Sequence, residues 1–155
     1  MNRLKFPMII AGVLVLGLIL VSAGCSKKQE AGGFGDAAAR VYVAPGSYDE
    51  FYSFMSGGFS GQVSVYGLPS GRLFRVIPVF SQDPEKGYGY SEETKPLLMT
   101  THGFIPWDDA HHPQLSMTDG QTDGRWLFIN GNNSPRIARL DLSTFETVET
   151  IEIPN

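Results

Sequence analysis

The chain has 155 residues and a mass of 17.0 kDa, so it has room for one ordinary domain and excludes a large multidomain assembly. Apolar residues make up 42% and charged residues 18%, and 18 Gly and 10 Pro favour a turn-rich globular fold over a coiled coil or a disordered tail. The net charge of -4 argues against nucleic acid as a partner, and the single Cys excludes an internal disulfide and any site built on two thiolates.

The N-terminus has the pattern of a bacterial export signal. Arg3 and Lys5 precede an uncharged, mostly apolar stretch at 6–24 that ends in small residues, and Cys25 follows directly. We therefore expect residues 1–24 to be a lipoprotein-like signal peptide, and Cys25 to carry a lipid that tethers the protein to the membrane in the periplasm. Two alternatives stay open: simple cleavage near this point, and an uncleaved anchor, because about 19 apolar residues just span a bilayer.

The part after the signal divides into a tether and a domain. Residues 25–40 are polar and rich in Gly and Ala, without apolar periodicity, which is typical of a flexible tether. From 41 to 155 we expect one incomplete domain. Its first segment, 49–55, has the spacing of one or two amphipathic helical turns, with Ser47 as their N-cap.

A β-hairpin is predicted next along the chain. Apolar and polar residues alternate at 62–66, the segment 68–71 has the residues of a turn, and a second β-rich run follows at 73–80. The segment 82–95 after this hairpin is predicted to be a flexible excursion.

Four segments in the C-terminal third predict a second antiparallel meander. The run at 125–129 is almost continuously apolar, which is typical of a strand covered on both faces. Turn residues separate it from the strands predicted at 136–142 and 148–153. The segment at 113–118 is expected to be the innermost strand of this meander.

The two meanders resemble each other at an offset of about 74 residues, which aligns Val63 with Ile137 and Ile77 with Ile151. Repeated strand meanders of about 40 to 50 residues are the blades of β-propellers. The predicted fold class is therefore all-β: a partial β-propeller of about two to three blades, which needs further blades to cover its strand edges and apolar faces.

The three His of the chain lie close together in sequence, at His102, His111 and His112. Neutral imidazole binds copper, zinc and iron, and Asp109 is placed to hold the far ring nitrogen of a neighbouring His. Adjacent residues of a strand point to opposite faces, so His111 and His112 share one compact site only if the backbone twists, whereas a multinuclear site takes one ring on each metal ion. Pro113 biases His112 toward an extended conformation. The alternative is a His pair without metal, and His102 is predicted to be an ordinary loop residue.

Five segments together resemble nitrous oxide reductase, particularly the branch exported by the general secretory route. The most specific part is the His pair followed by a strand with the sequence Asp-Gly-Arg-Trp. The segments cover most of the chain after Tyr48, at 52–58 with 61–63, 69–72, 77–80, 109–113 and 123–130.

The resemblance implies a seven-bladed propeller joined to a C-terminal cupredoxin domain, and reduction of nitrous oxide to dinitrogen and water in denitrification. It also implies a tetranuclear copper-sulfide cluster held by His side chains at the propeller hub. A dinuclear copper centre in the cupredoxin domain would take electrons from a periplasmic donor such as a cytochrome c. His111 and His112 match the first two cluster ligands, Asp109 matches a carboxylate that supports them, and the full-length protein is expected to be a homodimer.

The chain departs from the family pattern in three respects. It stops before the other cluster His and the Cys pair of the dinuclear centre, so we expect an N-terminal fragment that is inactive alone. It lacks the twin-arginine signal of the better-known branch, and Asp108 stands where the family pattern has Gly. Two other functions stay open: a lipid-anchored, non-enzymatic propeller that binds a protein or ligand, and a hydrolase that uses one metal ion at His111 or His112.

Overall fold

The computed structural model of the chain describes residues 37–154. The predicted signal peptide, Cys25 and most of the predicted tether lie outside these residues, and the last residues of the tether begin a short helix, α2 Ala37–Val41. The chain divides into two units, 1–40 and 41–155, and the fold described below is that of the second. No helix in the described part of the chain is long and apolar enough to span a membrane.

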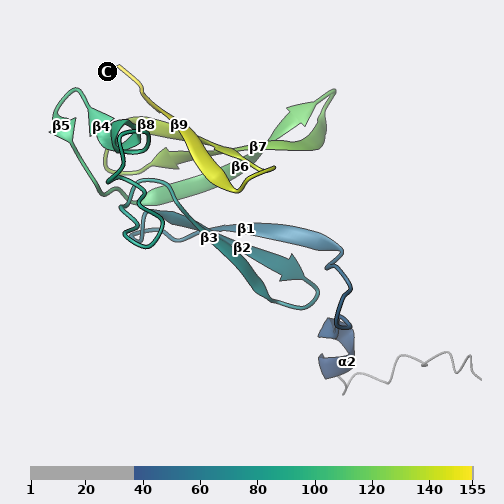
Figure 1. The fold of residues 1–155 in the computed structure, drawn as a ribbon. Coiled ribbons are helices and arrows are strands. Elements are labelled where there is room, and N and C mark those ends of the chain that lie inside the picture. The colour runs from purple at the N-terminus through teal and green to yellow at the C-terminus, as the bar shows by residue number, and fades with distance from the viewer. Residues whose placement is uncertain (1–36, 155) are drawn as a thin grey trace, which may run out of the picture. The chain divides into compact units, whose positions relative to one another are not determined.

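Antiparallel strands dominate the second unit, which confirms the predicted all-β class (Figure 1). Apart from them, its described residues contain one 3-10 helix, η1 Lys95–Leu98. The strands form three sheets: β1 Phe51–Ser56, β2 Gln62–Leu68 and β3 Leu73–Pro78; β4 Met99–Thr100 and β5 Gly103–Phe104; β6 Ala110–Thr118, β7 Gln121–Gly131, β8 Arg136–Asp141 and β9 Glu146–Glu152. The arrangement of further sheets into a propeller stays a prediction.

The first strand corrects the sequence analysis, because the predicted helical turns at 49–55 are wrong. Most of this segment belongs to β1, which pairs with β2 from Phe51 opposite Leu68 to Ser56 opposite Val63. Aromatic residues favour a half-buried strand, and the neighbouring strand supplies backbone hydrogen bonds that an isolated short helix lacks. A helical and an extended pattern are hard to tell apart over so few residues.

The predicted hairpin is confirmed as β2 and β3. Val63 and Val65 of β2 are fully buried, and their neighbours Gln62, Ser64 and Tyr66 are partly exposed, as the alternating pattern predicts. Asp49 stabilises the turn between the strands. Its carboxylate accepts hydrogen bonds from the backbone N–H and the hydroxyl of Ser70, and its Oδ2 forms an ion pair with Nη2 of Arg72 at 2.8 Å.

The predicted second meander is also confirmed, with the strand order β6-β7-β8-β9. The expectation that both faces of β7 are covered is wrong for the described chain. Leu127 and Ile129 are buried, whereas the side chain of Phe128 between them is 38% exposed. An apolar run does not by itself reveal which face meets a neighbour, and here one face of this sheet is open.

The two larger sheets share one hydrophobic core. Thr147 on β9 donates a hydrogen bond from its hydroxyl to the carbonyl of Pro78 at 2.7 Å, which links the outer strands of the two sheets. The fully buried members of the core come from both sheets and from the segment after β3: Val63, Val65, Ile77, Val79, Phe80, Ala110, Leu127, Ile129, Ala138 and Leu140.

The predicted repeat is correct for the strands but not for their faces. The offset of about 74 residues aligns β2 with β8, yet it sets the buried Val63 against the half-buried Ile137. The buried pair Val63 and Val65 corresponds instead to Ala138 and Leu140, one residue further along. Because side chains alternate with a period of two, a shift of one residue exchanges the two faces of a strand.

The segment 82–95 is attached to the sheets at its centre, although the sequence predicts a flexible excursion. The side chain of Tyr88 is 5% exposed, and its hydroxyl donates a hydrogen bond to the carbonyl of Val79 at 2.7 Å. Burial raises the pKa of Tyr88 well above its ordinary value. The centre of the segment is therefore anchored to the residue that follows β3.

Candidate metal centre

The two neighbouring His lie at the beginning of β6, where this strand meets the first sheet. Ala110 forms an isolated bridge with Gly58, and its carbonyl accepts a hydrogen bond from the hydroxyl of Ser56. In the ladder with β7, His111 pairs with Asn130 but the next pair is Gln114 with Phe128. Two residues of β6 therefore oppose one residue of β7, which is the geometry of a β-bulge.

The backbone at His112 has a φ of +53°, so the residue is in the left-handed region. The expectation that Pro113 keeps His112 extended is therefore wrong. Because of this turn of the backbone, the rings of His111 and His112 come together, with centroids 5.6 Å apart and planes at 65°. A flat strand would point the two side chains to opposite faces. The structure thus contains the twist that a shared site requires.

A buried carboxylate lies against the first of the two rings. Oδ1 of Asp109 is 2.9 Å from Nε2 of His111, and the side chain of Asp109 is almost completely buried. This oxygen lacks a well-aligned hydrogen bond among the described residues. A carboxylate that accepts a hydrogen bond from one ring nitrogen leaves the other nitrogen available to bind a metal ion.

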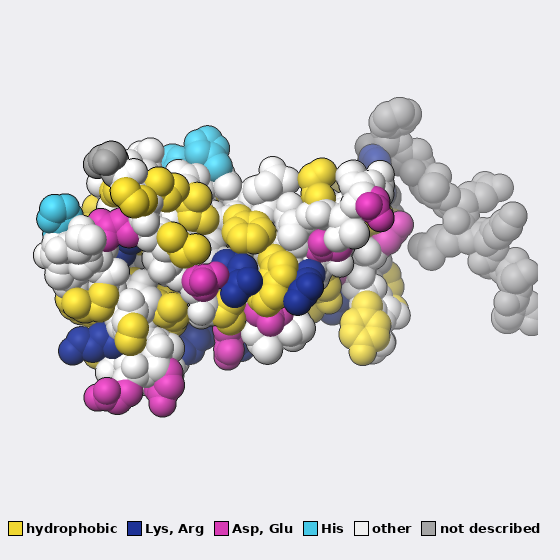
Figure 2. Space-filling model, turned by 90° about the horizontal axis from the view of Figure 1, so that it is seen from above, with side chains coloured by type: hydrophobic (Ala, Val, Ile, Leu, Met, Phe, Trp, Pro, Cys, Tyr) yellow, Lys and Arg dark blue, Asp and Glu magenta, His cyan; other side chains and the backbone are white. Residues whose placement is uncertain are grey.

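His102 lies apart from the pair, in the turn between β4 and β5. Its backbone N–H donates to the hydroxyl of Thr100, and its side chain is exposed. His side chains accordingly reach the surface in two separate places (Figure 2). The placement agrees with an ordinary loop residue.

The residues present fit a metal ion as one part of a larger site. Between residues 37 and 154, no group of three or more His, Cys, Asp or Glu side chains is arranged to hold a metal ion. His111 and His112 provide two nitrogen donors, and the carboxylate of Asp109 provides an oriented second layer. Imidazole suits copper, zinc and iron, so the donor set alone does not distinguish these metals.

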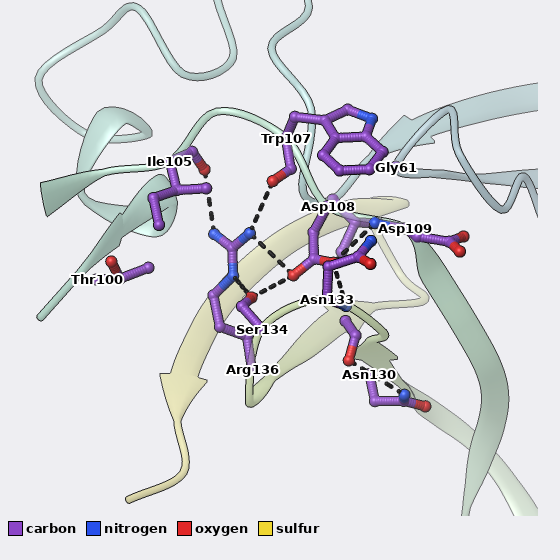
Figure 3. A network of polar contacts seen from close by, with 12 residues as sticks. Gly61, Thr100, Ile105, Trp107, Asp108, Asp109, Asn130, Asn133, Ser134 and Arg136 are labelled. Atoms are coloured by element: carbon purple, nitrogen blue, oxygen red, sulfur yellow. Dashed lines mark hydrogen bonds and ion pairs between the residues drawn. The ribbon is translucent and has the colours of Figure 1, made fainter. Parts of the chain in front are cut away.

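A buried ion pair that the sequence analysis missed lies directly behind this site. Asp108 and Arg136 are each 1% exposed, and Nη2 of Arg136 is 3.2 Å from Oδ2 of Asp108. Figure 3 shows the carboxylate of Asp108 pointing toward Arg136 and Ser134. The sequence held one signal, because Arg136 lies two and four residues before the apolar Ala138 and Leu140 and therefore shares their buried face of β8.

The carboxylate of Asp108 has four hydrogen-bond donors. Its Oδ1 accepts from the backbone N–H groups of Asp109 and Asn133, at 2.8 and 2.9 Å, and its Oδ2 accepts from Arg136 and from the hydroxyl of Ser134. Burial by itself would raise the pKa of Asp108, but these hydrogen bonds outweigh it and hold the pKa below its usual range. Asp108 is therefore a charged, fully satisfied group.

The left-handed backbone at His112 leads to a stability prediction. An Ala at this position is strained, whereas Gly adopts the same φ without a steric penalty. We expect His112→Gly to have a free energy of unfolding about 1 kcal/mol higher than His112→Ala. Urea denaturation of the two metal-free variants measures this difference, and a more stable Ala variant would contradict the left-handed conformation.

No family model matches the chain. The chain is 37% identical over 147 residues to nitrous-oxide reductase of Pseudomonas fluorescens and 36% identical over 146 residues to that of Stutzerimonas stutzeri. Each match covers 94% of this chain and 23% of the relative. The nitrous-oxide reductase of Cupriavidus necator is 38% identical over 122 residues, which are 77% of this chain and 19% of the relative. The predicted resemblance is thereby confirmed: over nearly its whole length, the chain is related to a segment of nitrous-oxide reductases that spans about a quarter of those proteins.

Proposed function

We propose that the chain is part of a copper-dependent nitrous-oxide reductase of denitrification, and that His111 and His112 are two of the ligands of its copper cluster. The observation that carries the proposal is the left-handed backbone at His112, which brings two adjacent imidazoles within 5.6 Å of each other. The name of the relatives, nitrous-oxide reductase, supplies the reaction, and copper is the metal that the resemblance of the sequence to this family implies.

The proposed reaction breaks the N–O bond of nitrous oxide. Two electrons and two protons are consumed, the oxygen leaves as water, and the two nitrogen atoms leave as dinitrogen. The copper cluster, when bound, supplies the electrons to this poor and inert substrate. The chain's own part is to hold the metal: His111 and His112 donate nitrogen without adding negative charge, and Asp109 fixes the ring of His111.

We further propose that the two larger sheets are neighbouring blades of a propeller. Each sheet buries one face in the shared core and leaves the other face open. Exposed apolar residues on the open faces include Phe51 and Leu68 in the first sheet and Phe128 and Ile151 in the second. Uncovered apolar faces of this kind favour packing against further sheets.

The site lies at the open side of the second sheet. His111 pairs with Asn130, Asn130 with Ile137, and Ile137 with Ile151, so these four residues form one row across β6 to β9. Ile137 is half-buried and Ile151 is exposed, which places the row on the open face. A further blade packed on this face would bring additional ligands beside His111.

The proposal extends to partners and location. Electrons would come from a periplasmic donor such as a cytochrome c, through a dinuclear copper centre in a part of the protein outside this chain. The enzyme would act in the periplasm as a homodimer, tethered to the membrane through a lipid on Cys25. The signal-like residues 1–24 followed by Cys25 support export and the lipid tether, whereas the electron donor, the dinuclear centre and the dimer are what the resemblance to nitrous oxide reductase implies.

Removing either imidazole should abolish the copper cluster. In the full-length protein produced in its native host, we expect His111→Ala and His112→Ala to lose the cluster's visible absorption and nitrous oxide reduction while the fold is retained. His102→Ala is the matched control, because this residue lies apart from the pair, and it should keep both properties. Normal absorption and turnover in either of the first two variants would refute the ligand assignment, and a wild-type protein with zinc alone or without metal would favour a hydrolase or a binding module.

The carboxylate of Asp109 should affect copper binding less than the ligands do. Loss of a group that orients a metal ligand typically weakens metal affinity about 10- to 100-fold, and we expect this range for Asp109→Ala. Asp109→Asn keeps an oxygen acceptor for the ring and should lose less. A competition titration with a copper chelator measures both affinities, and an unchanged titration curve for Asp109→Ala would remove the proposed role.

The proposed lipid anchor is tested by Cys25→Ser. A thioether-linked lipid cannot form on a hydroxyl side chain. We therefore expect this variant to move from the membrane fraction to the soluble fraction in a cell fractionation. Asp123→Asn, a substitution far along the chain from the signal, should remain with the membranes. Continued membrane association of Cys25→Ser would point to an uncleaved anchor.

A further inference from the structure

Two segments of the chain meet behind the His pair. One is 105–109, which leads into β6, and the other is the turn 131–134 between β7 and β8. The backbone N–H of Asn132 donates to the carbonyl of Asp109 at 2.8 Å, so the turn is attached to the residue whose carboxylate faces His111. A displacement of either segment would therefore move the support of the His111 ring.

Arg136 binds the first segment, 105–109, through hydrogen bonds from its guanidinium. Its guanidinium donates from Nη1 to the carbonyl of Ile105 and from Nη2 to the carbonyl of Trp107, both at 3.2 Å (Figure 3). The guanidinium also lies over the ring of Phe80, with 5.0 Å from Cζ to the ring centroid. Two carbonyls of the chain that leads to the His pair, those of Ile105 and Trp107, are thus fixed by one buried side chain.

Asp108 joins the two segments to each other. Its Oδ1 accepts from the N–H of Asp109 on one side and from the N–H of Asn133 on the other. The approach is close, because a Cβ on Gly131 would lie 2.4 Å from Oδ2 of Asp108. Figure 3 shows the side chain of Asp109 directed away from this network, so the two adjacent carboxylates have separate tasks.

We propose that Asp108 and Arg136 are positioning residues of the metal centre. They fix 105–109 against the turn 131–134 so that the carboxylate of Asp109 meets His111 and the strained backbone at His112 persists. The inference rests on the proposed function, because the groups that are positioned are the proposed copper ligands. It goes beyond that function in naming two residues that contact no metal.

A role in stability alone explains the pair poorly. Replacing a buried ion pair by apolar residues of similar volume is often neutral or stabilising, whereas removing one partner leaves a buried charge without compensation. Apolar residues cannot replace the directed hydrogen bonds of this pair. Arg136 donates to two carbonyls of 105–109, and Asp108 accepts from the N–H of Asp109 in that segment and from the N–H of Asn133 in the turn 131–134. The network therefore specifies a local geometry more than it adds stability.

This difference separates the two roles in one experiment. We compare three variants of the full-length protein produced in its native host: Asp108→Leu, Arg136→Met and the double variant Asp108→Leu/Arg136→Met. Copper affinity is measured by chelator competition and stability by thermal unfolding of the metal-free protein. Asp123→Asn is the matched control. Asp123 also accepts hydrogen bonds from two hydroxyls and a backbone N–H, but it lies in the hairpin formed by β6 and β7, at the other end of these strands from the His pair.

We expect each single variant to unfold at a lower temperature than the wild type, and the double variant to be more stable than either single one. Copper affinity should fall about 10- to 100-fold in all three, the range found for groups that orient metal ligands, and should stay unchanged in Asp123→Asn. A double variant that regains copper affinity together with stability would overturn the inference.

A metal-free measurement keeps the inference separate from the proposed function. Diethyl pyrocarbonate modifies accessible imidazole, and mass spectrometry reports the rate at each His. In the double variant we expect the rate at His111 to rise, because its ring loses the contact with Asp109, while the rate at the distant His102 stays the same. If the wild type binds no copper, the proposed function fails and the rate at His111 decides the inference: an unchanged rate would refute it.

Discussion

The candidate site depends on one departure from strand geometry. Consecutive side chains of a regular strand point to opposite faces, so two adjacent His cannot meet unless the backbone turns. The chain meets this constraint with a bulge at the start of β6 and a left-handed His112. Such a conformation costs about 1 to 2 kcal/mol in a residue other than Gly and persists only where its surroundings enforce it. Here the surroundings are the buried contacts of Asp108, Asp109 and Arg136.

The same geometry explains why the site is open. The first sheet covers one face of the second, and the row that begins at His111 lies on the other face. A metal ion bound there by two imidazoles lacks further donors among residues 37–154. The chain spans about a quarter of the length of the relatives it matches. In the proposed propeller, further donors and the apolar cover would come from other blades.

Most strands were predictable from the sequence because their patterns are local. The alternation at 62–66 and the turn residues around β7, β8 and β9 report burial and chain reversal directly. The prediction for 49–55 was wrong because so short an amphipathic pattern fits the period of a helix as well as that of a strand. Only the pairing with β2 decides between the two. The His pair and Asp109 were predictable as candidates from residue type. The φ of His112 and the contact of Asp108 with Arg136 were not, since both arise from segments that meet only after folding.

The central claim is that the rings of His111 and His112 both bind copper in the folded enzyme. A crystal structure of the complete copper-loaded protein, with anomalous diffraction recorded at the copper absorption edge, tests it most directly. Copper binding by both rings predicts anomalous peaks within bonding distance of one nitrogen of each ring. Copper peaks located elsewhere, with both rings in contact with solvent, would contradict it.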